Sequence, residues 1–262
     1  MSIDAVDRTV AILEHLAQEP DGLGVMRLAD RVGLAPSTLH RYLASLREHG
    51  LVDRTDDRSY ALTPRLYILG LSAAHGFDLE ANARSSLRRL ADASGETVCL
   101  MVRDGDHSVC IEQIESGHQL RIEARIGSRS DLRLGSTGRV LLAFTPTEVQ
   151  DEVLARKPLR GRTPNTITDP EQIRSLLEAI RRDGFFVSRS QVDDGVMAVA
   201  APVRDRSEEV IAAVAIVAPE SRMAAEPVLS GTIRLVLDEA NVLSQRLGNA
   251  RAPSASSERR TS

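Results

Sequence analysis

The side chains best suited to chemistry in this chain lie on one face of a predicted helix at residues 37–49. Hydroxyl, imidazole and guanidinium groups alternate there with apolar residues at helical spacing. Such groups donate hydrogen bonds to the phosphates and base edges of DNA. We therefore expect this face to contact a double-stranded DNA operator. Together with the proline that opens the helix, it consists of Pro36, Ser37, Thr38, His40, Arg41 and Ser45.

Two helical patterns joined by a glycine would position that polar face. In residues 25–32 the apolar side chains recur at i, i+3, i+4 and i+7, and Gly33 permits a sharp turn after them. Pro36 suits the first turn of the second helix. Helix, tight turn and helix with a polar outer face are typical of a helix-turn-helix. The buried stripe of the second helix is predicted to be Leu39, Tyr42, Leu43 and Leu46.

A hairpin is predicted directly after the second helix. Residues 51–54 and 59–62 alternate in polarity like two short strands, and residues 55–58 carry turn-forming side chains. This hairpin would form a wing whose Arg54 and Arg58 contact flanking phosphates. An earlier helix at residues 3–18 would brace the unit through a predicted inner face of Val6, Val10, Leu13 and Ala17.

The alternative interpretation of this segment is an ordinary three-helix packing unit with solvated charges. Residues 1–63 contain seven arginines, no lysine and ten acidic residues, a net charge of −3. DNA-binding domains are normally basic. The added hairpin favours DNA binding, and the acidic balance predicts weak binding to non-specific DNA.

Length and composition limit the remaining possibilities. The chain has 262 residues, of which 42% are hydrophobic and 27% charged, as in a globular protein of two modest domains. No apolar run approaches the ~20 residues of a membrane span, and the first residues do not resemble a signal peptide. Two cysteines argue against a disulfide-built secreted fold. We expect a cytoplasmic location and no membrane partner.

The second half of the chain is predicted to be an α+β domain with a six-stranded sheet flanked by helices. Two helices should come first, at residues 65–75 and 79–94, and a long helix should close the domain at 223–247. Thr145 and Asp169 stand where helix caps are expected. The predicted strands are 97–103, 107–114, 120–125, 185–188, 196–203 and 210–217, with helices at 138–144, 147–154 and 170–182 between them.

Catalytic and metal interpretations find little support. Cys99, His107 and Cys110 lie near one hairpin but lack the ligand spacing of a zinc site. The six histidines share no arrangement with an acid and a nucleophile. The pair Asp193-Asp194 precedes Gly195, which marks a solvated turn. The sequence predicts no enzyme, no metal and no cofactor.

One small-residue segment remains a candidate ligand site. Gly135-Ser136-Thr137-Gly138 lacks the lysine and preceding strand of a nucleotide-binding loop. It leads into a short helix predicted to begin near Thr137, and free N–H groups at a helix start suit an anion. A capped helix without a ligand is an equal alternative.

Six motifs, in order, resemble the IclR family of bacterial transcriptional regulators over about residues 3–248. This resemblance implies a winged helix-turn-helix at 1–63, a dimerising linker helix at 64–78 and a GAF-like effector-binding domain at 79–248; composition predicts a disordered tail at 249–262. The motifs are RTVAIL at 8–13, LAPSTLHR at 34–41, YALTP at 60–64, Gly127, GSTGRVLLA at 135–143 and GVMAVAAPV at 195–203.

Function follows from the resemblance as an expectation. Family members bind operators as homodimers or pairs of dimers and respond to small organic acids or aromatic metabolites. We therefore expect an effector-responsive regulator, by default a repressor. A constitutive DNA-binding protein whose second domain only oligomerises is the main alternative, and an enzyme with an accessory DNA module is a weaker one.

The expected effector pocket departs from the family pattern. Arg139 replaces the usual lysine after Gly138, and Gln191 replaces the usual glutamate. The strand at 213–217 lacks the usual serines, so we expect a ligand with a carboxylate or hydroxyl at one end and a hydrophobic or aromatic body. Small, highly polar acids should bind poorly. The predicted pocket residues are Met101, Ser136, Thr137, Gly138, Ser188, Ala198, Ala215 and Val217.

Overall fold

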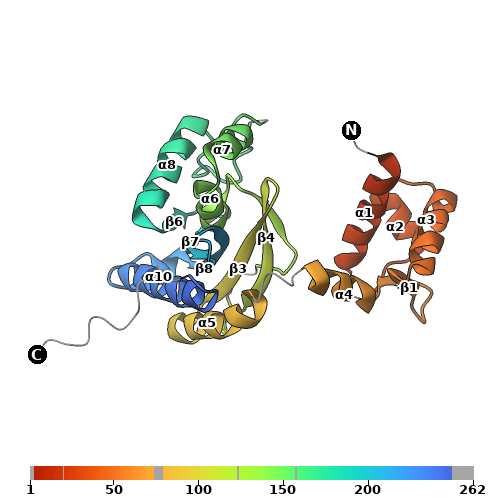
Figure 1. Cartoon of the computed structure of the whole chain (residues 1–262), viewed down its shortest axis with the longest axis horizontal. Helices are drawn as coiled ribbons and strands as arrows, with labels where there is room; N and C mark the ends of the chain where they lie inside the picture. Colours follow the sequence, from red (N-terminus) through yellow and green to blue (C-terminus); the bar gives the residue numbers. More distant parts are fainter. Residues whose placement is uncertain (1–2, 20, 74–78, 123, 157, 250–262) are drawn as a thin grey trace, which may run out of the picture. The chain divides into compact units, whose positions relative to one another are not determined.

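The chain forms two compact units, residues 1–77 and 78–262 (Figure 1). The computed structural model describes residues 3–19, 21–73, 79–122, 124–156 and 158–249. The predicted tail lies almost entirely outside the described residues, as does the predicted end of the linker helix at 74–75. Each unit is described separately below.

The first unit is a winged helix-turn-helix, as predicted. Gly33 ends the second helix in the left-handed region at φ 69°, and Pro36 is the first residue of the third. Two three-residue strands pair antiparallel to form the wing. The elements are α1 (Asp4–Ala17), α2 (Val25–Val32), α3 (Pro36–Glu48), β1 (Val52–Arg54), β2 (Tyr60–Leu62) and α4 (Pro64–Ala73).

The predicted inner face of α1 is wrong. Ile12 and Leu16 are the buried residues of this helix, whereas Val6 is 55% and Val10 47% exposed. The apolar residues of α1 fit two adjacent helical stripes, so periodicity alone does not choose between them. The stripe with the two larger side chains faces the core, where burying more apolar area is more favourable. The predicted stripe of α3 is confirmed by the complete burial of Leu39 and Leu43.

The second unit is built on one antiparallel sheet of six strands in the order β5-β4-β3-β8-β7-β6. This agrees with the predicted α+β architecture. The long strands β3, β7 and β8 form its centre. The strands are β3 (Thr97–Asp104), β4 (His107–Ile114), β5 (Arg129–Asp131), β6 (Phe186–Arg189), β7 (Val196–Arg204) and β8 (Val210–Pro219).

Helices cover both faces of this sheet (Figure 1). One face packs against α5 and α10 through alternate residues such as Leu100, Val199 and Val214. The opposite face packs against α6 through Met101, Ala200 and Ala215, among others. Small residues on the central strands let the helices approach closely. The helices are α5 (Leu79–Ser94), α6 (Gly135–Ala143), α7 (Thr147–Leu154), α8 (Pro170–Asp183), α9 (Glu220–Met223) and α10 (Val228–Arg246).

The predicted strand at residues 120–125 is wrong. The described residues of this segment form no strand, and the sixth strand is instead β5, which pairs with β4. Side chains satisfy the backbone of Ala124 in this segment, since its N–H donates to Gln113 Oε1 and its carbonyl oxygen accepts from Cys110 Sγ. A segment whose backbone groups have such partners needs no strand neighbour.

Two helix boundaries and one predicted cap differ from the structure. The α6 helix begins at Gly135, three residues before the prediction, because glycines at its start carry no apolar signal. The closing helix was predicted to begin at residue 223, but α10 begins at Val228, after the short α9 and Pro227. Asp169 caps α8 by accepting from Glu171 N–H at 2.9 Å, as predicted, but Thr145 caps nothing: its hydroxyl donates to Leu142 O.

Candidate functional sites

The predicted DNA-facing side chains of α3 lie opposite its buried stripe. Ser37, His40, Arg41 and Ser45 are exposed, as is Pro36 at the first position, and Thr38 is half-buried. Sequence reasoning missed a groove of about 560 Å³ between α1 and α3, which is lined in part by Arg41 and Ser45. These two residues thus border a concave surface, whereas Ser37 and His40 are not among those that line it.

Hydrogen bonds within the wing hold its turn. The carboxylate of Asp57 accepts from the Thr55 hydroxyl and from Ser59 N–H at 3.1 Å, and these bonds lower the pKa of Asp57. Arg58 adopts a left-handed conformation at φ 70°. Arg54 and Arg58, the predicted phosphate contacts, are both exposed. The acidic tip of the wing therefore has a structural role in this turn.

Strand register brings the predicted effector residues of the sheet onto one face. Met101 lies opposite Ala213, and Ala215 lies opposite Ala200, on the face that α6 covers. Ala198 lies between Ser188 on β6 and Val217 on β8. Ala215 is fully buried, and Ser188 is 5% and Ala198 9% exposed. Ser188, Ala198 and Val217 thus form one row across three strands, and Ala215 lies two residues along β8 from that row. Met101 lies farther away, at the level of Ala213.

The first turn of α6 contains the remaining predicted effector residues. Ser136 is buried and Thr137 half-buried, and both lie within the first turn, where N–H groups lack helical partners. Gly138 packs against the preceding loop: a Cβ placed on it would lie 2.8 Å from Leu132 O. Only glycine allows this close approach of helix and backbone.

A fully buried arginine, which the sequence analysis did not include among site residues, follows Gly138. The Arg139 side chain is 0% exposed. Its Nε donates to Arg133 O at 3.0 Å, Nη2 donates to Ile167 O at 3.1 Å, and Nη1 donates to Gln191 Oε1. The guanidinium carbon lies 5.5 Å from the centre of the Phe186 ring. Arg139 therefore joins the loop just before α6 to two segments that are distant in the sequence.

The two family departures around this site are in direct contact. Arg139 and Gln191 form one hydrogen-bonded pair, although they are 52 residues apart. No salt bridge of Arg139 is found among the described residues, and burial lowers its pKa to about 10. The guanidinium is still charged at neutral pH, so this end of α6 combines a buried cation with free N–H groups. The replacement of the family's usual lysine and glutamate by Arg139 and Gln191 was the only feature of the sequence that marked these two positions.

The two cysteines lie on the α6 face of the sheet and are both buried thiols. Burial raises the pKa of Cys99, and it raises the pKa of Cys110 to about 11. His107 contacts Asp106 rather than a cysteine. Within the described ranges, no group of three or more histidine, cysteine or acidic side chains could hold a metal ion.

The raised pKa of Cys110 predicts a loss of stability at alkaline pH. Unfolded thiols lose their protons near pH 9, whereas folded Cys110 keeps its proton to about pH 11. The folded state then binds more protons, so the free energy of unfolding falls between these values, by about 1–3 kcal/mol. Urea unfolding at pH 8 and pH 11 should show a larger loss for the wild type than for Cys110→Ala. Equal losses would contradict this prediction.

Comparison with known proteins identifies the chain. Residues 71–245 match the family model described as "Bacterial transcriptional regulator IclR C-terminal", and residues 5–56 match "IclR helix-turn-helix domain". The chain belongs to the IclR family. The regulator KdgR of Escherichia coli is 31% identical over 226 residues, 86% of each chain. The repressor IclR of Escherichia coli is 29% identical over 224 residues, 84% of this chain and 82% of that protein.

Solved structures support the same fold. An IclR homolog complexed with 4-hydroxybenzoate, from Microbacterium hydrocarbonoxydans, superposes with a TM-score of 0.82 at 26% identity, covering 94% of this chain and 99% of that chain. The IclR regulator from Alicyclobacillus acidocaldarius gives 0.80 at 26% identity, covering 95% and 100%. These IclR-family relatives are DNA-binding transcriptional regulators, not enzymes. In the described part of the chain, no helix is long and apolar enough to cross a membrane.

Proposed function

We propose that the protein is a transcriptional regulator, by default a repressor, whose affinity for operator DNA changes when a small organic molecule binds the second unit. The observation that carries this proposal is the exposed polar face of α3 beside a wing, in a chain of the IclR family. The 4-hydroxybenzoate complex of a relative supports an aromatic acid as the effector class. A bacterial cytoplasmic location accords with this role.

The effector site is proposed at the α6 face of the sheet. Apolar walls from Met101, Ala198, Ala215 and Val217 would hold the body of the ligand, and the first turn of α6 would receive its carboxylate or hydroxyl. Binding should be coupled to DNA affinity by about 1–3 kcal/mol. If DNA affinity does not change with any acid that binds, the protein is a constitutive regulator instead.

We further propose that the active form is a homodimer or a dimer of dimers. One recognition helix reads only a few base pairs, so two are normally needed, about one helical turn apart. Exposed apolar residues of α4 support this assembly, because Ile68 is 60% and Leu69 52% exposed. Such residues on a short connecting helix fit a surface that a second copy covers.

Two arginine variants test the DNA-binding face. Arg41→Ala should weaken binding to the upstream intergenic DNA of its own gene by about 1–3 kcal/mol, because a base-edge contact is lost. It should change the affinity for random DNA little. Arg58→Ala, the matched control, should weaken both equally and reduce the salt slope by about one unit, because it loses a phosphate contact. Fluorescence anisotropy with both DNAs, over a salt series, measures these effects. Equal weakening by Arg41→Ala on both DNAs would exclude the proposed role of α3.

A further inference from the structure

The start of α6 contains a buried positive charge that lacks a counter-ion. Among the described residues, only Arg133 and Arg139 are buried arginines. Arg133 pairs with the carboxylate of Asp131 at 2.7 Å. Arg139 has no carboxylate partner in the described part of the chain, since its hydrogen bonds reach two backbone carbonyls and the amide oxygen of Gln191. A cation that is out of water without an opposite charge is costly, so it favours the binding of an anion.

The acidic side chains of the turn after β6 and of α9 are paired with other arginines. Asp193 lies 3.0 Å from Arg162, and Glu220 lies 3.7 Å from Arg189. Burial lowers the pKa of Arg139 to about 10, and no carboxylate of the described ranges offsets this effect. The positive charge of Arg139 is therefore uncompensated.

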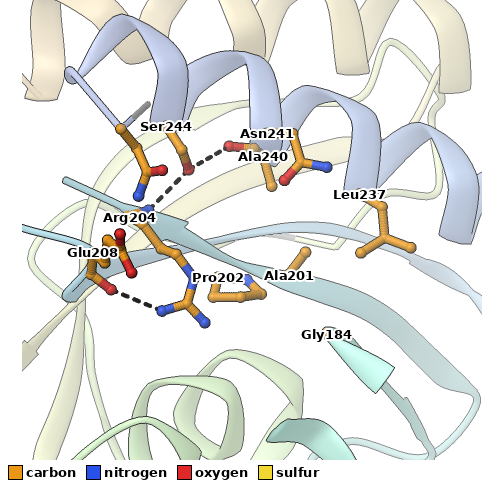
Figure 2. A pocket seen from close by; sticks show the side chains of 10 residues that line it. Gly184, Ala201, Pro202, Arg204, Glu208, Leu237, Ala240, Asn241 and Ser244 are labelled. Carbon is orange, nitrogen blue, oxygen red and sulfur yellow. Dashed lines mark hydrogen bonds between the residues drawn. The ribbon is translucent and has the colours of Figure 1, made fainter. Parts of the chain in front are cut away.

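The arginine at the end of β7 provides a contrast (Figure 2). Arg204 lines a cavity of about 290 Å³ together with Glu208, and its Nη1 donates to Glu208 O at 2.8 Å. Burial lowers the pKa of Arg204, and the negative charge of Glu208 opposes this effect. That cavity already contains a carboxylate beside its cation, so an acidic ligand would gain little there.

The uncompensated charge lies beside the first turn of α6. Helical side chains lean toward the N-terminus of their helix, and Arg139 Nε reaches the carbonyl oxygen of Arg133, two residues before α6 begins. Gln191 precedes Val192, whose side chain packs on the helix start: a Cβ placed on Gly135 would lie 3.1 Å from Val192 Cγ2. The guanidinium and the free N–H groups of this turn therefore produce a positive potential at the same place.

Two buried hydroxyl groups accompany this charge. Ser136, in the first turn of α6, is 3% exposed, and Ser188 is 5% exposed; no hydrogen bond of either side chain is found among the described residues. Ser188 lies on β6 two residues after Phe186, whose ring is 5.5 Å from the Arg139 guanidinium. Neither hydroxyl is fully sealed, since His15 Nδ1 is the one fully buried side-chain polar atom without a partner in the described ranges. Buried polar groups normally have hydrogen-bond partners, so these hydroxyls can bind the oxygens of a ligand.

We infer that Arg139 is the specificity-determining charge of the proposed effector site, and that it selects a ligand with an ionised carboxylate over a neutral ligand of the same shape. Because Nε, Nη1 and Nη2 already donate to protein acceptors, Arg139 acts on the ligand through its charge. The hydroxyls of Ser136 and Ser188 would supply direct hydrogen bonds. The inference rests on the proposed effector site and narrows its ligands, because a hydroxyl or an amide could not replace the carboxylate.

Replacing Gln191 by glutamate tests this inference. Gln191→Glu would place the missing negative charge at the atom that already accepts from Arg139, so the shape of the site is kept. The probes are benzoate and cyclohexanecarboxylate, each compared with its neutral amide by calorimetry on the full-length protein. The wild type should bind each acid at least about tenfold more tightly than its amide. Gln191→Glu should lower this acid-to-amide ratio at least about fivefold, because it neutralises the nearby charge.

Two control variants separate charge from structure. Gln191→Met removes the hydrogen bond but adds no charge, so the acid-to-amide ratio should stay near that of the wild type. Gln119→Glu adds the same charge at an exposed position of the loop after β4 and should leave the ratio unchanged. An equal fall of the ratio in Gln191→Met and Gln191→Glu would overturn the inference, because the hydrogen bond rather than the charge would then matter.

The wild type alone can also contradict the inference. Equal affinity for acid and amide, or binding of neither acid, would overturn it, as would an unchanged ratio in Gln191→Glu. Affinity for operator DNA, measured separately with and without each acid, tests the proposed function. Acids that bind with the expected ratio and leave DNA affinity unchanged would contradict the proposed function and not the role of Arg139.

Discussion

Replacing Gly138 by alanine should destabilise the second unit by about 1–3 kcal/mol, even though alanine is the better helix former. The added Cβ would lie 2.8 Å from Leu132 O and 3.1 Å from Asp131 O. Both are backbone atoms, at the end of β5 and in the loop before α6, so no flexible side chain can move aside. The start of α6 would have to shift, and ligand binding at that turn should weaken with it.

Gly231→Ala is the matched control. Gly231 lies within α10, and an added Cβ there would meet nothing within 4 Å. The same chemical change should stabilise this helix by about 0.5–1 kcal/mol. Urea unfolding followed by circular dichroism therefore should give changes of opposite sign for the two variants. If Gly138→Ala is as stable as the wild type, the close packing of α6 on its loop has no energetic role.

Arg139→Met should lower the free energy of unfolding by about 2–4 kcal/mol. The change leaves Arg133 O, Ile167 O and Gln191 Oε1 without their donor, at about 1–3 kcal/mol for each unsatisfied group. Removing a desolvated charge offsets part of this loss, since burial lowers the pKa of Arg139 to about 10, a change that corresponds to about 3 kcal/mol. The lost hydrogen bonds should outweigh that gain.

Arg182→Met provides the comparison, because the Arg182 side chain is 74% exposed and, among the described residues, pairs with the adjacent Asp183 alone. Its effect should be near zero. The loss of stability in Arg139→Lys should fall between those of the two methionine variants. An ammonium keeps the charge but cannot reach acceptors on three segments as the planar guanidinium does. Thermal and urea unfolding measure all three variants. A stable Arg139→Met protein would show that α6 and its loops are held by apolar packing alone.

The sequence predicted the first unit well because its signals are local. Gly33 and Pro36 mark the turn and the start of α3 within four residues, and the apolar residues of α2 and α3 each fit a single stripe. The prediction of which face of α1 is buried was wrong, because Ile12 and Leu16 form a second apolar stripe beside Val6 and Val10. Only the packing of the whole unit decides between two such stripes.

The second unit shows where local pattern fails. Residues 120–125 alternate like a strand. The side chains of Gln113 and Cys110, however, hydrogen-bond to the backbone of Ala124, where a neighbouring strand would otherwise have done so. Alternation on the β-strands did place Met101, Ala198 and Ala215 on one face, because the two-residue period fixes the side each residue faces. The Arg139–Gln191 contact spans 52 residues, and no spacing rule relates residues that far apart.

The internally bonded wing has a consequence for the entropy of DNA binding. Fixing the backbone of a flexible residue costs about 1–2 kcal/mol in conformational entropy. The Asp57 carboxylate holds Thr55 and Ser59 before any DNA is present, so the four-residue turn meets this cost during folding. A disordered wing would lose this conformational entropy only when it bound the operator, and every complex would be weaker by that amount. An acidic residue at the tip thus helps an arginine-bearing loop to adopt its binding conformation before it contacts a polyanion.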